Sequence, residues 1–489
     1  MLIDEEFYQN LILKFVQIGR LSWIVIYYSR IIRWILRKAY HIVLKSYMAL
    51  SREMEFHADE VSANIGGSFP AISALLRLSL AGDSFHYVWQ FYHRNISENL
   101  KTENIFPQHK FVMNLIAEKS KLNFVNGLPQ VTKELLSSFN RSKLVIQNQW
   151  ASHPLISDRV KRLEQLNIDS NVSHESAWNF FMNADDLQKN ITEKLFKNWQ
   201  FSETPVNIEQ KDFELRYTAD VQKNSYDERY SYFYEYRDIS RFDLNELLKS
   251  DENIVNDFEQ LYSENNLKLI FEFTGLTSDI KTIDSISRGE FDIDIYEYDG
   301  VKYKSKQSDE LGKSLVKVHK EMYKNIVELD KNIFRFFYSK AKILGKEQEL
   351  TAKYQTYFYL VEEDKNNLKI YLDLVNAIQF IYRVHSFSQI GIKMYEMKLK
   401  ENIFRDQIKK MLDDENYKES LSDNRREKFQ NYVNNNLIYF RDNKYDQEAL
   451  KILEETIYQF YEVCSSAPFY SLKNLLDFQI EILDSQYLK

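Results

Sequence analysis

The sequence predicts a mainly α-helical protein, and three observations support this prediction. Only 11 glycines and 6 prolines occur among its 489 residues, so few positions interrupt regular structure. Apolar residues recur every three or four positions over long stretches, as in LVKVHKEMYKNIVELDKNIFRFFY at 315–338, which is the spacing of one helical face. Hydrophobic residues make up 44% of the chain, enough for a sizeable core. A chain of this length predicts two or three compact units.

The charge and the cysteine content exclude several classes of protein. The formal net charge is -8, which argues against a nucleic-acid partner because no general positive field would attract phosphates. The single cysteine, Cys464, excludes an internal disulfide framework and a cysteine-based zinc cluster, and it is typical of a reducing compartment. The first residues, MLIDEEF, are acidic where a secretory signal would be basic, so we expect no such signal.

Residues 1–50 predict a basic, amphipathic, membrane-proximal segment. The uncharged run from Leu21 to Ser29 is shorter than the roughly 20 residues that cross a bilayer. If residues 21–45 are helical, isoleucines cover one side, Trp34 lies near the boundary, and a basic stripe covers the other side. The stripe comprises Arg30, Arg33, Arg37, His41 and Lys45. This pattern favours a helix at a membrane surface, on the cytoplasmic side. The alternative is a helix buried against another domain.

Further helices follow in order. Ser51 is positioned to cap a helix that runs through Ala63 and is broken at GGSFP, residues 66–70. Residues 71–96 are again amphipathic, with a possible break at Gly82. The segment WASHPLISDRVKRLEQL, 150–166, predicts a loop followed by a helix that Ser157 or Asp158 opens.

The C-terminal region, residues 171–489, is predicted to be helical, with one exception. The segment FDIDIYEYDGVKYKSK, 291–306, alternates apolar and polar residues around Asp299-Gly300. That dipeptide is typical of a type I′ turn, so a small β-hairpin is expected there. From about residue 308 to the end, the spacing predicts a helical array. The sequence assigns no role to this region.

Four acidic residues lie close together in SREMEFHADEVSANIGGS, 51–68. They are Glu53, Glu55, Asp59 and Glu60. Glu55 and Asp59 are four apart, so both carboxylates project from one face of a helix. A zinc site can use one such carboxylate as a ligand and the other to orient a histidine ligand. The alternative is a solvated, charged face, in which Arg52 pairs with the acids around it.

Two segments together resemble a known family. SREMEFHADEVSANIGGS and, some eighty residues later, ASHPLISDRVKRLEQL are similar to the second half of the membrane-bound zinc metalloendopeptidases that include the HtpX heat-shock protease and the CAAX prenyl endopeptidase. In that family a segment of the type S-R-x-x-E-F/Y-x-A-D precedes a segment of the type S/T-H-P followed by an arginine. The resemblance covers about residues 46–168, and it places the peptidase part at 51–170.

The resemblance implies a role for each matched residue. Glu55 is expected to be the glutamate zinc ligand, and Asp59 the carboxylate that holds a zinc-bound histidine. His153 lies where the family has a histidine that donates to the developing oxyanion. Arg159 corresponds to the arginine that supports this region. The implied activity is hydrolysis of peptide bonds in a protein or peptide substrate by water that Zn²⁺ activates.

The sequence departs from the family in one respect. The family's H-E-x-x-H motif supplies two zinc ligands and the general base, and no two of the nine histidines are four apart. HESAW at 174–178 has Trp178 where the second ligand would be. The histidines are His41, His57, His86, His93, His109, His153, His174, His319 and His385.

This departure defines the expected fold and leaves two functions open. We expect a helical zincin-type peptidase remnant that lacks its H-E-x-x-H half, followed by a large helical C-terminal region with one small β-hairpin. The other two zinc ligands would come from the missing N-terminal segment, and the chain alone is predicted to be inactive. The second possibility is a non-catalytic helical interaction protein that retains a degenerate peptidase shell. A plain soluble helical scaffold would leave the two matched segments unexplained.

Overall fold

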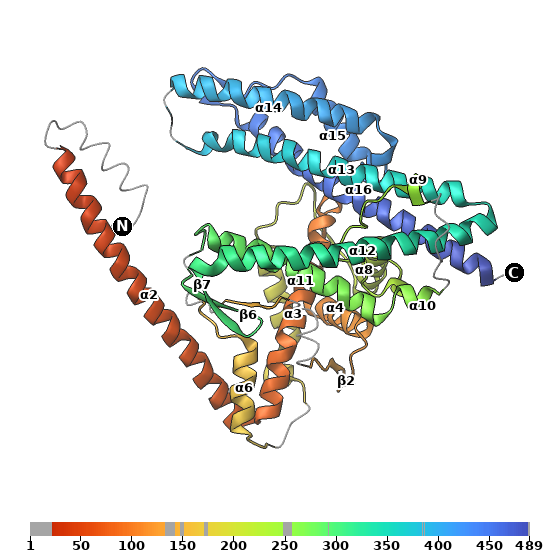
Figure 1. Ribbon diagram of the computed structural model, residues 1–489. Helices are drawn as coiled ribbons and strands as arrows, with labels where there is room; N and C mark the ends of the chain where they lie inside the picture. Colours follow the sequence, from red (N-terminus) through yellow and green to blue (C-terminus); the bar gives the residue numbers. More distant parts are fainter. Residues whose placement is uncertain are drawn as a thin grey trace. The chain divides into compact units, whose positions relative to one another are not determined.

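The computed structural model describes residues 22–132, 142–146, 151–170, 175–247, 257–291, 293–383, 385 and 387–487. The chain divides into two compact units: unit 1 is drawn from Met1–Val221 and Lys281–Glu310, and unit 2 from Gln222–Ile280 and Leu311–Lys489. Helices dominate both units, which confirms the mainly α-helical prediction (Figure 1). The predicted boundary at residue 170 falls inside unit 1.

The helices fall into three groups by unit. Unit 1 contains α2 (Ser22–Gly66), α3 (Ser68–Arg94), α4 (Ile105–Lys119), α6 (Ile156–Leu166), α7 (Ala184–Phe196) and all of α8 (Gln210–Lys223) except its last two residues, which belong to unit 2. In unit 2 lie α9 (Leu244–Leu247), α10 (Phe258–Leu261), α13 (Glu347–Ile378), α14 (Phe387–Asp413), α15 (Asp423–Asn434) and α16 (Gln447–Tyr487). Residues of both units occur in α11 (Glu264–Ser287) and α12 (Ser308–Leu344).

Short strands form small sheets among the described residues. Parallel pairing joins β1 (Leu100–Lys101) to β5 (Val206–Asn207). Antiparallel pairs join β2 (Phe124–Val125) to β3 (Leu128–Pro129) and β8 (Phe440–Arg441) to β9 (Lys444–Tyr445). A three-stranded sheet has the order β4-β6-β7. Its strands are β4 (Leu144–Val145), β6 (Ile295–Tyr298) and β7 (Val301–Lys304).

The predicted hairpin at Asp299-Gly300 is confirmed, but the expectation of a single hairpin is wrong, because β2–β3 and β8–β9 also form hairpins. Tyr298 pairs with Val301 across the turn, and the turn residues Asp299 and Gly300 have φ values of 51° and 79°. Positive φ at both central residues defines a type I′ turn, which follows the twist of the strands. The third strand, β4, was not predicted. Its neighbour Lys143 accepts a hydrogen bond from the amide of Asp299 at 3.0 Å through its backbone oxygen.

Three predicted helix boundaries differ from those in the structure. Ser51 lies inside α2 and does not cap a new helix, because no breaker precedes it and the helix continues from Ser22. The break at Gly82 is wrong: α3 continues through it, and a lone helical glycine costs only about 1 kcal/mol. Helix α6 begins at Ile156, so Ser157 and Asp158 lie in its first turn.

The break at 66–70 is confirmed, and Gly67 causes it. Gly67 has a φ of 90°, and a Cβ added there would lie 2.4 Å from Oγ of Ser170. Only glycine adopts this conformation readily, so α2 ends at Gly66 and α3 begins at Ser68. Pro70 lies in the first turn of α3, where its missing N–H is tolerated.

Unit 1 contains an aromatic core and two smaller apolar clusters. The aromatic core joins α3, α4 and α8 around Phe91, Tyr92 and Phe213. Ala63 of α2, Leu75 of α3 and Leu163 of α6 form one of the smaller clusters and are all buried. This cluster holds the C-terminal end of α2 against α6.

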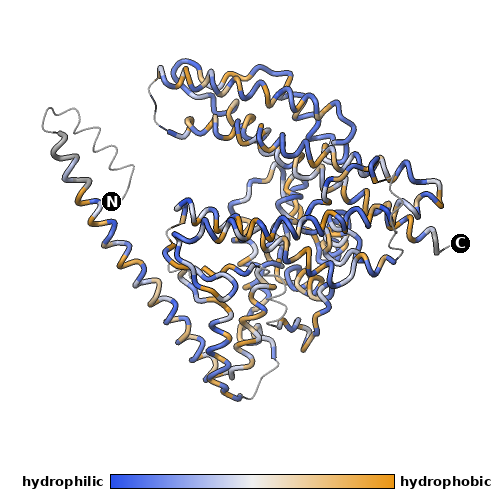
Figure 2. Tube along the Cα trace, viewed as in Figure 1, coloured by the Kyte–Doolittle hydropathy of each residue, from blue (hydrophilic) through white to orange (hydrophobic). Residues whose placement is uncertain are grey.

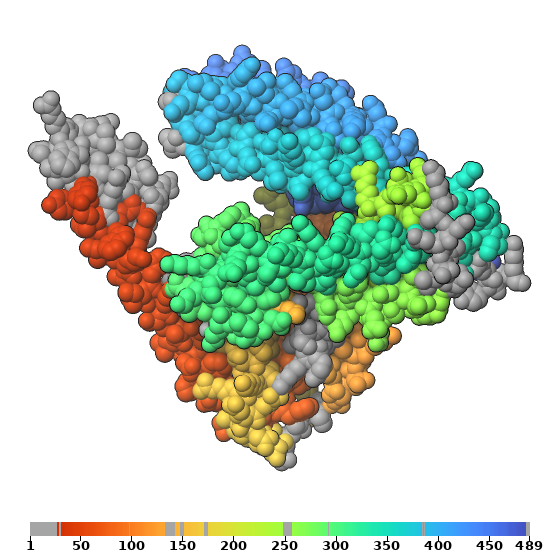
Figure 3. All heavy atoms as spheres, in the orientation of Figure 1, coloured from red at the N-terminus to blue at the C-terminus, as the bar shows by residue number. Residues whose placement is uncertain are grey.

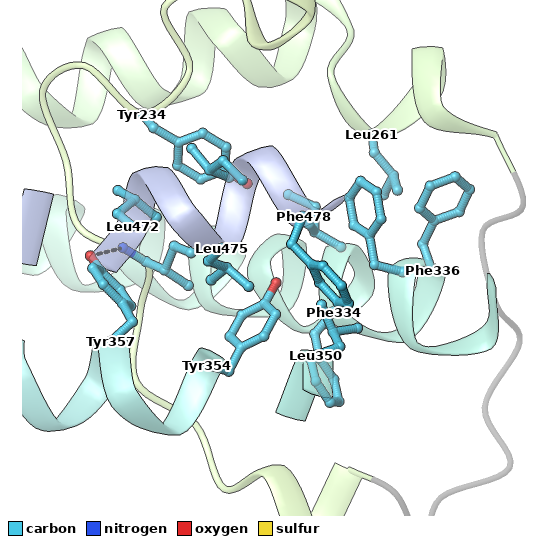
Figure 4. Packing of buried hydrophobic residues seen from close by; sticks show 14 of the residues in the cluster. Tyr234, Leu261, Phe334, Phe336, Leu350, Tyr354, Tyr357, Leu472, Leu475 and Phe478 are labelled. Carbon is cyan, nitrogen blue, oxygen red and sulfur yellow. Dashed lines mark hydrogen bonds between the residues drawn. The ribbon is translucent and has the colours of Figure 1, made fainter. Parts of the chain in front are cut away.

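Unit 2 has two large cores along α13 and α16. Figure 4 shows part of one, where Phe334, Tyr354, Leu475 and Phe478 pack together. The other core lies around Phe404 and includes many residues of α14, α15 and α16. The predicted helical array after residue 308 is thereby confirmed.

Candidate functional site

The two segments that resemble the peptidase family meet in unit 1. The C-terminal end of α2 lies beside α6 and α3 (Figures 1 and 3). Helix α2 carries Glu55 and Asp59, whereas His153 precedes α6 and Arg159 lies within it. The four residues assigned from the sequence are therefore brought together, although about 100 positions separate the two pairs.

Asp59 and Arg159 form a two-point ion pair. Nε of Arg159 donates to Oδ2 of Asp59 at 2.7 Å, and Nη2 donates to Oδ1 at 2.6 Å. Both side chains are largely buried, with 12% of Asp59 and 19% of Arg159 exposed. The hydrogen bonds to Asp59 raise the pKa of Arg159, against the opposing effect of burial. Such planar, paired hydrogen bonds fix the orientation of both groups.

Glu55 contacts two partners from the second segment. Nδ1 of His153 donates to Oε1 of Glu55, and Nη1 of Arg159 lies 3.3 Å from Oε2. The ring of His153 is mostly exposed to solvent, whereas the Glu55 side chain is only 23% exposed. A polar group of another molecule can therefore reach His153 from the solvent side.

A second arginine of α6 holds the other two acids. Nε of Arg162 donates to Glu60 at 3.0 Å and its Nη1 donates to Glu53 at 3.3 Å. Its guanidinium also lies 4.7 Å from the ring centre of Phe56. Sequence reasoning did not identify Arg162. Its position three residues after Arg159 could have pointed to it, because residues three apart are neighbours on a helix surface and Arg162 therefore lies beside Arg159 on α6.

Arg52 connects α2 to the loop before α6. Its Nη1 donates to the backbone oxygen of Ala151 at 2.7 Å. Arg52 therefore bonds a residue of the second segment. The alternative of a solvated face, in which Arg52 pairs with the acids around it, does not account for this contact. The C-terminal end of α2 is thus joined to residues 151–162 at three points along its length, through Arg52, Arg159 and Arg162.

The donor set matches part of a zinc site. Glu55 supplies a carboxylate oxygen and His153 an imidazole, and both are common zinc ligands. Within the described residues, no three histidine, cysteine or acidic side chains are grouped so that they could hold a metal ion. Because a catalytic zinc generally needs three protein ligands, these residues do not form a complete zinc site. His174, the first residue of HESAW, lies outside the described residues.

Helix α2 presents many apolar side chains to solvent. Those at least half exposed include Tyr28, Ile32, Trp34, Ile35, Ile42, Val43, Tyr47, Leu50, Met54, Val61 and Ile65. Figure 2 shows apolar and polar residues interleaved along this helix. None of the helices in the described ranges combines the length and apolar character that a bilayer crossing requires. The side chains of Ile24 and Arg30 lie outside the described residues.

Comparison with known proteins adds no further assignment. No family model, no curated protein sequence and no solved structure matches the chain.

Proposed function

We propose that residues 51–170 are the C-terminal half of a zinc-dependent, membrane-associated metalloendopeptidase domain, similar to the HtpX and CAAX prenyl endopeptidase family. The observation that supports this most is the pairing of the two matched segments. Glu55 meets His153 and Asp59 meets Arg159. A solvated charged face would not require a largely buried aspartate–arginine pair, since burying two charges is costly unless they are well paired.

Each residue has a distinct role in this proposal. Glu55 is the zinc ligand that this chain supplies. Asp59 orients Arg159, and Arg159 positions Glu55 through its contact with Oε2. His153 is exposed and adjacent to Glu55, so its ring can donate a hydrogen bond to the oxygen of a peptide bound there. Two more zinc ligands and a general base are required. The substrate is a protein or peptide.

One observation favours the alternative of a non-catalytic helical interaction protein. Oε1 of Glu55 accepts a hydrogen bond from His153, and Oε2 forms an ion pair with Nη1 of Arg159 at 3.3 Å. These contacts hold the carboxylate in place without a metal, although the buried Oε2 accepts no hydrogen bond within the part of the chain that the structure describes. The two functions therefore differ in whether Zn²⁺ displaces His153 from Glu55 when further ligands are present.

Supplying an H-E-x-x-H segment tests the proposed function. We expect the 489-residue chain alone to bind Zn²⁺ weakly and to cleave no peptide. When a segment bearing H-E-x-x-H is added, fused ahead of α2 or as a separate polypeptide, bound zinc and chelator-sensitive cleavage of casein should both appear. Zinc is measured by elemental analysis after gel filtration, and cleavage by electrophoresis.

The control replaces both histidines of the added segment with alanine. It should restore neither zinc binding nor cleavage. Chelator-sensitive cleavage by the chain alone would contradict its predicted inactivity. Binding of the added segment without any zinc would instead favour the non-catalytic function.

The membrane part of the proposal rests on α2. No acidic residue occurs between Ser22 and Arg52, so every charged residue of this stretch is basic. At 100° per residue, Ile35, Val43 and Leu50 lie on the side of α2 opposite to Glu55 and Asp59. An amphipathic helix of this kind binds anionic lipid surfaces. The candidate site would then face away from the bilayer, on the cytoplasmic side.

Removing two positive charges from α2 is expected to weaken binding to anionic vesicles. Each basic residue near an anionic surface contributes about 1 kcal/mol, so the double variant Arg37→Gln/Lys38→Gln should lose about 2 kcal/mol of binding free energy. Binding should also weaken with added salt, because screening acts over about 8 Å at physiological ionic strength. Co-sedimentation with phosphatidylserine vesicles measures both effects.

A matched control makes the same charge change elsewhere in unit 1. Lys302 of β7 and Lys306, two residues after β7, are both exposed, so Lys302→Gln/Lys306→Gln should bind nearly as well as the unmodified chain. If the chain binds neither anionic nor neutral vesicles, α2 is not a membrane-surface helix.

A further inference from the structure

Unit 1 contains a cavity that the proposed peptidase site does not use. Its volume is about 470 Å³, within the range of about 300–1,000 Å³ that ligand pockets span. The C-terminal half of α7, the segment between α7 and β5, and the residues at and after β1 form its walls. Its lining includes Lys101, Glu103, Lys189, Glu193, Lys197 and Trp199.

One wall of this cavity is a fixed aromatic surface. Trp199 packs edge-on against Trp89, with ring centres 4.8 Å apart, and lies 4.4 Å from the ring of His93. Phe196, which also lines the cavity, is 5.1 Å from Trp199. The indole is therefore held by neighbouring rings, while part of it remains exposed. A flat apolar group can stack on such a surface.

A buried asparagine, Asn99, orders the segment between α7 and β5, part of which lines the cavity. Asn99 has a φ of 54°, and its Oδ1 accepts hydrogen bonds from Ser202 Oγ and from the amide of Glu203, both at 3.1 Å. The backbone oxygen of Asn99 also accepts from the amide of Val206 at 2.8 Å. These bonds order the segment before β5, so a ligand would not have to order it on binding.

Charges of both signs line the cavity, and some already have partners. Lys189 pairs with Asp185 at 2.7 Å, and Glu103 accepts a hydrogen bond from Asn207 at 3.4 Å. Three others remain: Lys101, Lys197 and Glu193. Within the described residues none of these three forms an ion pair. The cavity therefore offers two cations and one carboxylate beside an aromatic wall.

We propose that this cavity binds a zwitterionic aromatic ligand, either a free aromatic amino acid or a short peptide that ends in one. The ring stacks on Trp199, the carboxylate is bound by Lys101 and Lys197, and the ammonium group by Glu193. An aromatic phosphate fits less well, because Glu103 and Glu193 would repel its charge. The proposal concerns binding alone and does not depend on the peptidase function.

Four small compounds test which groups the cavity recognises. L-phenylalanine carries the ring and both charges, its amide lacks the carboxylate, 3-phenylpropionate lacks the ammonium group, and L-alanine lacks the ring. Saturation-transfer NMR with the full chain should rank phenylalanine first. Each of the other three should bind about tenfold more weakly or worse, since each loses a charge-assisted contact or the stacking surface. The dipeptide Gly-Phe, measured beside phenylalanine, distinguishes a peptide from a free amino acid.

Variants then locate the binding site. Lys197→Gln should weaken phenylalanine about tenfold but leave its amide unchanged, and Glu193→Gln should weaken phenylalanine but not 3-phenylpropionate. Lys194→Gln is the control, because Lys194 lies on α7 outside the cavity lining and should change nothing. Circular dichroism of each variant should match that of the unmodified chain. The proposal is wrong if phenylalanine does not bind, if its amide or 3-phenylpropionate binds equally well, if adenosine 5′-monophosphate binds more tightly, or if folded Lys197→Gln and Glu193→Gln bind phenylalanine normally.

Discussion

Replacing Asp330 with alanine is expected to lower the free energy of unfolding of unit 2 by about 3–5 kcal/mol, the cost of breaking a buried ion pair from one side. Asp330 of α12 pairs with Arg237 through two hydrogen bonds, at 2.9 and 2.6 Å. Only 4% of the Arg237 side chain and 1% of the Asp330 side chain are exposed. Asp330 also accepts from the amide of Ser240 at 2.8 Å. The variant would leave both of these donors buried without their acceptor.

The raised pKa of Arg237 also indicates a strong interaction with Asp330. Burial alone would lower it, but the charge and hydrogen bonds of Asp330 outweigh burial and raise the pKa of Arg237 above its ordinary value. The guanidinium therefore stays charged in the folded protein. Its position 4.7 Å from the ring centre of Phe233 adds a favourable contact but does not replace a carboxylate.

Urea unfolding of unit 2, followed by circular dichroism, measures this effect. The control is Asp406→Ala, which removes an exposed aspartate whose partner is Lys409 at 3.1 Å. Exposed pairs contribute about 0–1 kcal/mol, so the control should unfold nearly like the unmodified chain. Equal, small losses in both variants would show that the Arg237–Asp330 pair contributes little. A double change, Arg237→Met/Asp330→Leu, should recover much of the loss because no unpaired charge remains.

The second large effect concerns Glu55 and His153 in the completed enzyme, and it rests on the proposed function. Glu55→Gln should weaken zinc by more than the roughly 10–100-fold that loss of an outer hydrogen-bond partner costs. His153→Ala should retain zinc but lower kcat about 10²–10³-fold, the usual cost of removing one oxyanion donor. Zinc titration and steady-state kinetics separate the two roles.

Glu53→Gln is the matched control for this pair. Glu53 lies on the same helix but contacts Arg162, so its isosteric change should leave zinc affinity and kcat unchanged. Equal zinc content and activity in Glu55→Gln and His153→Ala would show that the two roles are misassigned. A loss of zinc in both would mean that His153 also acts as a ligand.

Local features of the fold were predictable because local residues determine them. Asp299-Gly300 specifies its turn through two positive φ angles, and Gly67 ends α2 for a similar reason. The helix start predicted at Ser51 and the helix break predicted at Gly82 are both wrong, because α2 and α3 continue through these residues. A residue that favours a boundary does not create one when the residues on both sides remain helical and pack as one helix.

Contacts between distant residues were predictable only where a resemblance linked them. The sequence pattern placed Glu55 and Asp59 on one helical face. Arg162 could be inferred only from its position three residues after Arg159, and the spacing of Glu53 and Glu60 gave no sign of it. The Arg237–Asp330 pair spans 93 positions, and nothing near either residue indicates the other. Which charges become buried together depends on how whole helices pack, and spacing along one helix carries no such information.

The separation of Asp59 from Arg159 has a consequence for biosynthesis. The two residues are 100 positions apart, and at about 5–20 residues per second a ribosome adds Arg159 about 5–20 s after Asp59. During that interval α2 has neither its arginine partners nor the apolar cover of Leu163. If α2 binds lipid as proposed, the nascent helix, with its basic stretch and exposed isoleucines, can do so before the rest of the site exists. Any translation product that stops before residue 159 carries the acids without the arginine that orients them.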